Sequence, residues 1–435
     1  MLRENLKMHV KAENLSYDVS QMNCLEVTKL FLKYDFNEQL LEIVHLYPDQ
    51  WPTGVAVSES GRIFSCFPAG NDELNSNNGT NNVFQVAELT GFDTETAYPN
   101  ETYNNPPGGC VDFTGPFPRT KGLSNYLLSV PTVAFDQNDV LYLLDNGRCI
   151  YNGVRLEASP GGPKLVSVDL NSDTVTRTYT FPPDVVTPES FLGDVEFDRQ
   201  GYAYITDFSP TGDNSIIVLN LDDGDSWRVL MRDDSSISIG VEGLTISNDF
   251  STLYYTGTAL RFLYTVPTDL LRNRSTPAIE LVAAVRVVTM QGVTPVIGID
   301  DSGYIYSGNA EQSAITVYDT TTGYKIPFVR DKRIGFIGRL DIVDNTKYLY
   351  FTSNQFQRLP ILYQPPDPLG EDRRQRPFVL FRIPLLNTKN HFILSVAKFL
   401  FHHSLLREGK PNSDFFTPLF SCSQISLEKL TESGN

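Results

Sequence analysis

The sequence predicts an all-β protein, a six-bladed β-propeller closed by strands from both ends of its repeat region. A two-strand phrase recurs six times, two further strand-like runs follow most copies, and helix signals are nearly absent between Trp51 and Pro384. Units of four short strands at a spacing of roughly 45–60 residues are typical of propeller blades. We therefore expect a short N-terminal extension over 1–39, a propeller over 40–385, and a partly helical or disordered C-terminal tail over 386–435.

The repeated phrase predicts the two inner strands of each blade. Every copy alternates apolar and polar residues, turns at Asp, Asn or Gly, and continues into a second apolar run. This alternation is the signature of a strand, and the turn residues favour a tight hairpin. The copies begin at Pro52, Val130, Leu192, Gly240, Thr294 and Ile337.

The sixth repeat lacks one strand, which predicts how the ring closes. Only PFVLFRIPL at 377–385 follows its hairpin, whereas the unassigned run LLEIVHLYP at 40–48 precedes the first repeat. A sheet with two apolar faces must stack on neighbours, and a closed ring leaves no open end. We expect the strand at 40–48 to pair with the strand at 378–385. The predicted blades are 49–125, 126–184, 185–235, 236–290, 291–333 and 334–385.

Composition and charge limit the classes of partner. The chain is 41% hydrophobic and 20% charged, as in ordinary globular proteins. Its 35 Lys and Arg against 52 Asp and Glu give a net charge of −17. The negative electrostatic field of such a chain repels nucleic acid and favours metal cations or protonated amines as partners. No apolar run is long enough to span a bilayer, so we expect no membrane partner, and the sequence gives no sign of oligomeric state.

The cysteines and the glycosylation sequons bear on the compartment. Five cysteines are too few for a disulfide scaffold, although Cys110 and Cys149 flank one predicted blade and could pair. The first twenty residues contain no apolar segment of the kind found in a signal peptide. Four Asn-x-Ser/Thr sequons, at Asn14, Asn78, Asn100 and Asn273, mildly favour secretion. The last three lie in polar loops, and we predict glycosylation there.

The candidate ligand site lies where the innermost strands begin. In a propeller these strands line a central channel, and the start of each strand faces the channel mouth. Six residues stand at these starts, one of which is Pro295. We predict that the other five bind ligand: Thr53, Thr132, Asp194, Glu242 and Asp341. A ring of carboxylates suits Ca²⁺, with Asp194 and Glu242 as metal ligands, or the ammonium group of a ligand. The alternative is that each acid caps a strand by accepting backbone N–H groups.

No catalytic residue is predicted. The chain has no GxSxG, HExxH, P-loop or glycine-rich dinucleotide motif, and no Ser/His/Asp or Cys/His set. Residues that close the blade hairpins, among them Asp145 and Asn146, are expected to shape turns.

Four phrases together indicate a family. They are YPDQWPTGVAVSESGRIFSCFP from Tyr47, LGDVEFDRQGYAYITDF from Leu192, GVEGLTISNDFSTLYYTGTALRFLYTVPTDLLR from Gly240, and GRLDIVDNTKYLYFTSNQ from Gly338. On these residues the chain resembles the Yellow / major royal jelly family, in its fungal branch, over about 40–385. The resemblance implies a six-bladed propeller that is usually secreted, and we therefore expect an extracellular protein.

The resemblance leaves two classes of function open. Members include proteins of cuticle pigmentation, some linked to dopachrome conversion, and salivary binders of biogenic amines. We favour a non-catalytic propeller that binds a small amine or aromatic metabolite at its central channel. The alternative is an enzyme, either a metal-dependent lactonase-like hydrolase or a dopachrome-type isomerase. Calcium-dependent lactonases share the fold and hold a metal on channel carboxylates, but Thr53 stands where blade one would need an acid, which disfavours that reading.

Overall fold

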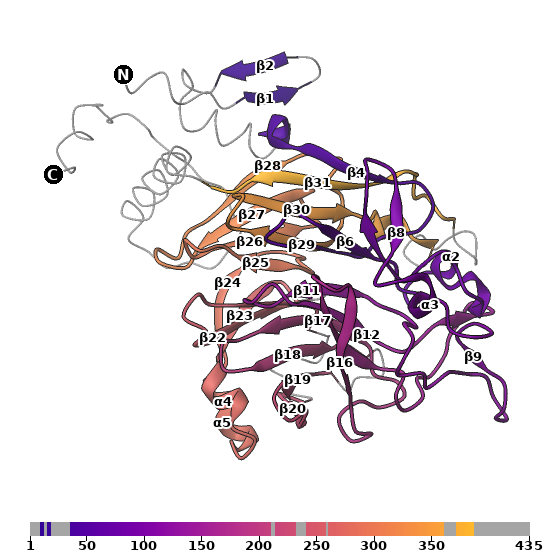
Figure 1. The fold of residues 1–435 in the computed structure, drawn as a ribbon. Helices are drawn as coiled ribbons and strands as arrows, with labels where there is room; N and C mark the ends of the chain where they lie inside the picture. Colours follow the sequence, from indigo (N-terminus) through magenta and orange to yellow (C-terminus); the bar gives the residue numbers. More distant parts are fainter. Residues whose placement is uncertain are drawn as a thin grey trace.

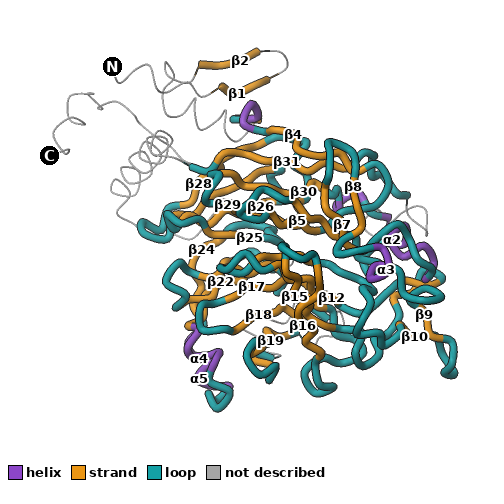
Figure 2. Tube along the Cα trace, in the orientation of Figure 1, coloured by secondary structure: helices purple, strands orange, loops and turns teal. Residues whose placement is uncertain are grey.

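A computed structural model describes residues 9–12, 15–18, 35–209, 214–231, 241–257, 260–360 and 371–386. Its strands form six blades around a ring, which confirms the predicted six-bladed all-β propeller (Figure 1). Figure 2 shows strands throughout the described chain, joined by loops, with a few short helices at the edges. The four labelled helices are short: α2 (Glu73–Ser76), α3 (Glu101–Asn104), α4 (Thr268–Arg272) and α5 (Ala278–Ala284).

Each blade is an antiparallel sheet, in which the first-named strand is innermost and the others follow it outward. Blade one contains β5 (Gly54–Val57), β6 (Ile63–Cys66), β7 (Val86–Leu89) and β8 (Glu95–Ala97). Blade two contains β11 (Thr132–Phe135), β12 (Leu141–Asp145), β15 (Lys164–Asp169) and β16 (Thr174–Thr180). Blade three contains β17 (Leu192–Phe197), β18 (Tyr202–Asp207), β19 (Ser215–Asn220) and β20 (Ser226–Val229).

The remaining blades follow the same pattern. Blade four contains β21 (Gly243–Ile246), β22 (Thr252–Thr256), β23 (Phe262–Pro267) and β24 (Arg286–Met290). Blade five contains β25 (Ile297–Ile299), β26 (Tyr304–Asn309), β27 (Ala314–Asp319) and β28 (Lys325–Arg330). Blade six contains β29 (Ile337–Val343), β30 (Tyr348–Ser353), β31 (Phe378–Pro384) and β4 (Glu42–Tyr47).

Blade six closes the ring with strands from both ends of the repeat region. Strand β4 pairs antiparallel with β31, so that Tyr47 lies opposite Phe378 and His45 opposite Leu380. In Figure 1 the indigo β4 lies beside the yellow β31. The predicted pairing of the 40–48 and 378–385 strands is therefore confirmed.

The N-terminal extension adds to blade five. Strand β3 (Asp35–Phe36) pairs with β28 at its outer edge, and β1 (His9–Ala12) and β2 (Leu15–Asp18) continue the same sheet. Buried Asn37 follows β3 and donates from Nδ2 to the Phe328 carbonyl at 2.8 Å. The chain thus contributes an outer strand to two neighbouring blades before the first repeat begins. The predicted tail, apart from its first residue, lies outside the described residues.

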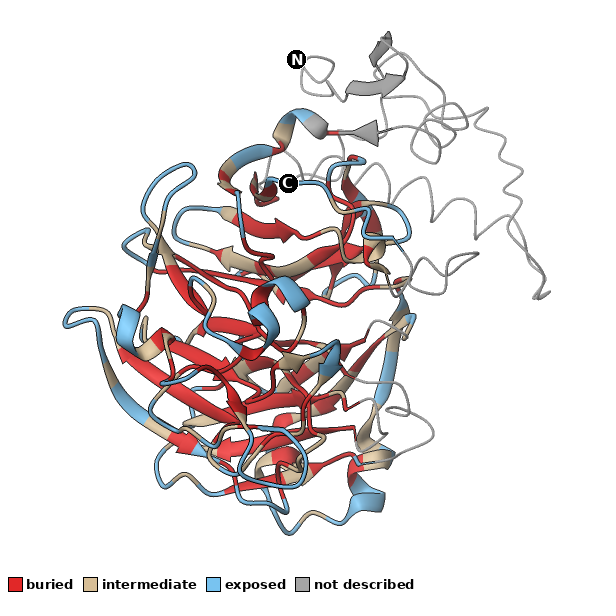
Figure 3. Ribbon diagram, turned by 90° about the vertical axis from the view of Figure 1, so that its right-hand side faces the viewer, coloured by how far each residue is buried: buried red, intermediate tan, exposed pale blue. Residues whose placement is uncertain are grey.

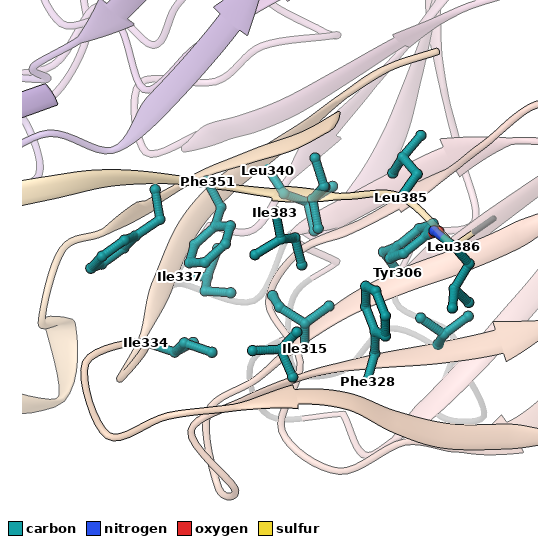
Figure 4. Packing of buried hydrophobic residues seen from close by; sticks show 14 of the residues in the cluster. Tyr306, Ile315, Phe328, Ile334, Ile337, Leu340, Phe351, Ile383, Leu385 and Leu386 are labelled. Atoms are coloured by element: carbon teal, nitrogen blue, oxygen red, sulfur yellow. The ribbon is translucent and has the colours of Figure 1, made fainter. Parts of the chain in front are cut away.

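Apolar side chains between facing blades form the core. Between blades five and six, Tyr306, Ile315 and Phe328 pack against Phe351 and Ile383 (Figure 4). Figure 3 shows buried strands throughout the ring and exposed loops around it. Burying one such side chain contributes about 1.5–3 kcal/mol, so the contacts between blades are a main source of stability.

One disulfide connects loops of the first two blades. It joins Cys110, which precedes β9 (Val111–Asp112), to Cys149, which precedes β13 (Ile150–Tyr151), as the sequence suggested. Among the described residues Cys66 is a free, buried cysteine. Within the same part of the chain, no helix is both long and apolar enough to cross a membrane.

Candidate ligand-binding site

The six innermost strands surround a channel that opens into a cavity of about 390 Å³. Strands β5, β11, β17, β21, β25 and β29 each contact the next around the ring. The cavity lies where these strands end and turn into the second strand of their blades, and all six blades line it. Its volume falls in the range of small-molecule sites, about 300–1,000 Å³.

Contacts between successive turns link the blades around the cavity rim. Five are hydrogen bonds of 2.7–3.2 Å, and the sixth places a guanidinium 4.7 Å from a ring centroid. These contacts join Glu59 to Asp139, Gln137 to Phe197, Arg199 to Phe250, Asn248 to Asp300, Asp301 to Asp344, and Asn345 to Glu59. The rim is therefore preorganised, which reduces the entropy lost when a ligand binds.

Two half-buried carboxyl groups from opposite blades line the cavity. Glu196 lies on β17 of blade three and Asp341 on β29 of blade six. Burial raises the pKa of Glu196 to about 8, and the negative charge of Asp341 adds to this rise. Burial also raises the pKa of Asp341 to about 6, although the Val57 N–H, 2.8 Å from Oδ2, and the charge of Arg339 oppose the rise. Both groups would gain from a cation placed between them.

An ion pair joins the same two blades beside these carboxyls. Arg339, two residues before Asp341, pairs with Asp194, two residues before Glu196, and their side chains are only 12% and 8% exposed. Asp194 also accepts backbone N–H groups from Val195 at 2.9 Å and Leu244 at 3.1 Å. Burial lowers the pKa of Arg339 to about 10, against the effect of the Asp341 charge. The Arg339 charge is thus largely compensated by Asp194, and without a cation beside it the Glu196 carboxyl keeps its proton up to about pH 8.

The predicted site residues do not converge on one site. Asp341 lines the cavity, whereas Thr53, Thr132, Asp194 and Glu242 are outside its lining, toward the starts of the innermost strands. Thr53 Oγ1 donates to the Pro131 carbonyl at 2.9 Å, and Thr132 Oγ1 donates to the Gly193 carbonyl at 2.6 Å.

These side chains link neighbouring blades through the backbone. Thr53 bonds Pro131, just before the first strand of blade two, and Thr132 bonds Gly193 in the first strand of blade three. Asp194 accepts the Leu244 N–H of blade four. Asp341 accepts the Val57 N–H of blade one. The contacts of both acids match the alternative reading, in which strand acids satisfy backbone donors.

The described residues do not fit the expected calcium site. In this part of the chain no group of three or more His, Cys, Asp or Glu side chains could hold a metal ion. Both carboxylate oxygens of Asp194 already accept N–H donors. Asp194 therefore does not fit as a calcium ligand beside Glu242.

Glu196 and Arg339 were not predicted as site residues. Their signal is visible in the sequence: DVEF and GRLD each place two charged residues at alternate positions of an innermost strand. A strand buried in a propeller centre is expected to be largely apolar, so alternate charges there indicate a polar lining of the channel.

The three predicted glycosylation sites in the described chain are exposed. Asn78 lies beside α2, Asn100 caps α3, and Asn273 follows α4. Asn14 lies outside the described residues.

One family model and several solved structures are similar to this chain. The family model described as Major royal jelly protein matches residues 128–365. Among curated proteins no relative matches the chain. A gluconolactonase from Xanthomonas campestris is similar at 12% identity and a TM-score of 0.45, covering 81% of this chain and 91% of its own. A luciferin-regenerating enzyme is similar at 12% identity and a TM-score of 0.47, with the match covering 80% of this chain and 95% of the enzyme. The calcium-binding protein regucalcin from Agrobacterium tumefaciens is similar at 15% identity and a TM-score of 0.46, with the match covering 78% of this chain and 91% of regucalcin.

Proposed function

Because the chain belongs to the major royal jelly protein family, we propose that it is a secreted propeller that binds a small amine in its channel cavity. The observation that carries this proposal is the pair of half-buried carboxyls, Glu196 and Asp341, on opposite sides of a cavity of about 390 Å³. An ammonium group between them would be attracted by both.

The cavity lining favours an amine attached to an apolar or aromatic body. Beside the two carboxyls it includes the rings of Phe135 and Phe250 and the aliphatic side chain of Ile297. A unit charge pair 4 Å apart near a protein surface is worth about 4 kcal/mol before desolvation is counted. The rings would add apolar contact area for the rest of the ligand.

Calorimetric titration of the full chain with 2-phenylethylamine and with the neutral 2-phenylethanol tests the proposal. We expect the amine to bind at least about tenfold more tightly, which corresponds to about 1.4 kcal/mol. Glu196→Gln and Asp341→Asn should each remove most of that preference. Glu280→Gln, a matched change at an exposed position of α5, should leave it unchanged. Equal affinity for the amine and the alcohol, or an unaltered preference in Glu196→Gln, would refute the proposed site.

The enzyme alternative is an outcome of a parallel assay. A lactone and dopachrome panel with the same protein would reveal turnover, and loss of that turnover with EDTA would indicate a metal-dependent hydrolase. Such a result would overturn the assignment as a binding protein.

Family membership also supports an extracellular location. Members of this family are generally secreted, and disulfides such as Cys110–Cys149 persist in oxidising compartments. Expression through a eukaryotic secretory pathway should give a product whose mass falls on treatment with N-glycosidase. The fall should shrink stepwise with Gln at Asn78, Asn100 and Asn273, and a product that carries no glycan would contradict this prediction.

A further inference from the structure

A pair of arginines converges at the end of the propeller opposite the cavity. Arg148 follows β12, and Arg155 ends β14 (Val154–Arg155). The end of β12 pairs with the start of innermost strand β11, which places Arg148 away from the cavity. Arg148 Nη1 donates to the Glu189 carbonyl at 2.7 Å, and the Arg155 guanidinium lies 4.2 Å from the centroid of Phe191. Both guanidiniums therefore reach the same short connection between blades two and three.

Neither arginine has a carboxylate partner among the described residues. Arg148 Nε donates to the Leu156 carbonyl at 2.8 Å, and Arg155 Nε donates to the Gly70 carbonyl at 2.6 Å. No ion pair joins either arginine to a described acid, whereas Arg228 and Arg374, which are as buried as Arg148, both pair with aspartates.

Burial and mutual repulsion make this arrangement unfavourable for two charges. Burial lowers the pKa of Arg155 to about 10, and the charge of Arg148 adds to that effect. Burial also lowers the pKa of Arg148, which is only 6% exposed. Three acids, Glu189, Asp207 and Glu157, oppose the fall at longer range. Of these acids, Asp207 pairs with Arg228, and Glu157 pairs with Arg119.

A buried donor two residues before Arg148 also lacks an acceptor within the described chain. Asn146 is fully buried, and its Oδ1 accepts the backbone N–H of Arg148 at 3.0 Å. This bond fixes which end of the amide is oxygen, because an NH₂ group could not accept it. The amide nitrogen has no hydrogen-bond partner in the described chain. Buried donors are normally satisfied, so the unpaired amide of Asn146, two residues before Arg148, indicates a missing acceptor.

We propose that Arg148 and Arg155 form a binding site for a small oxyanion, a phosphate, sulfate or carboxylate group. The planar guanidinium presents several N–H donors in a geometry that matches two oxygens of such a group. Only Nε and Nη1 of Arg148 and Nε of Arg155 donate within the described protein, so donors remain for a ligand. Arg155 is half-buried, whereas Arg148 is buried. An anion between the two arginines would compensate both charges, and it would not involve Glu196 or Asp341.

Thermal unfolding of the full chain in inorganic phosphate, sulfate or acetate, each against chloride at equal ionic strength, tests this site. A ligand that binds only the folded state raises Tm progressively with its concentration. We expect such a rise with at least one of the three oxyanions, and a dissociation constant weakened about tenfold or more in Arg155→Gln. No rise beyond that of chloride with any of the three would overturn the proposal.

Controls separate ligand binding from structural damage. Arg155→Gln also removes the hydrogen bond to Gly70, so its Tm without oxyanion is expected to fall. Binding is therefore judged only from the increment in Tm that the oxyanion produces in each variant. Arg155→Lys, which keeps the charge, should retain part of that increment. Arg274→Gln, at an exposed arginine paired with Asp225, should retain all of it. An increment of the same size in Arg155→Gln and in the parent would place the anion elsewhere and refute the assignment.

Discussion

Replacing Glu196 by Gln should make the stability of the protein less dependent on pH above pH 5. Burial raises the pKa of this carboxyl from 4.5 to about 8 in the folded protein. Between these two values the folded state holds a proton that the unfolded state releases. Stability therefore falls as the pH rises through this window, and the full loss is reached above pH 8. Glutamine is neutral at every pH and escapes this loss.

The structure sets the size of the effect. A rise in pKa from 4.5 to about 8 corresponds to a ceiling of about 5 kcal/mol at 1.36 kcal/mol per pKa unit. Glu196 is half-buried and faces a cavity that water can enter, so screening reduces the effect to on the order of 2 kcal/mol. We expect Glu196→Gln to be about as stable as the parent near pH 4 and more stable by about this amount at pH 9.

Urea unfolding at a series of pH values measures this difference. The free energy of unfolding of the parent should fall from pH 5 to pH 9 more steeply than that of Glu196→Gln. The exposed Glu280→Gln should follow the parent curve. Parallel curves for the parent and Glu196→Gln would refute the reasoning, since they would mean that Glu196 ionises as freely in the folded protein as in the unfolded chain.

Three further predictions concern stability. Arg339→Met leaves the buried carboxylate of Asp194 without its charged partner, so urea unfolding should show a loss of about 3 kcal/mol, partly restored when Asp194→Asn is added. Changing both Cys110 and Cys149 to Ala removes a disulfide between residues 39 positions apart and should lower the free energy of unfolding by about 3–4 kcal/mol. Under reducing conditions, which open the disulfide of the parent, the two proteins should be equally stable. Gly243→Ala would place a Cβ 2.6 Å from a backbone oxygen of the next blade, and should lower stability by about 1–3 kcal/mol; an unchanged midpoint would show that the blades can separate there.

The overall architecture could be predicted because its signals are local in the chain. Alternating apolar residues and Asp, Asn or Gly turns mark each hairpin within a few residues. The missing strand of the sixth repeat and the unassigned run before the first repeat then indicated the closure that β4 and β31 make. The addition of β3 to blade five left no comparable signal, because a two-residue strand has no readable period.

The candidate site depended on the tertiary structure. Glu196 and Asp341 line the same cavity because blades three and six stand opposite each other in the closed ring, a relation that no local pattern contains. The pairing of both strands is irregular as well, shifting between Leu192 and Val195 in β17 and between Ile337 and Leu340 in β29. A bulge breaks the simple two-residue alternation, so the sequence could place charges on the innermost strands but could not say which of them enter the cavity.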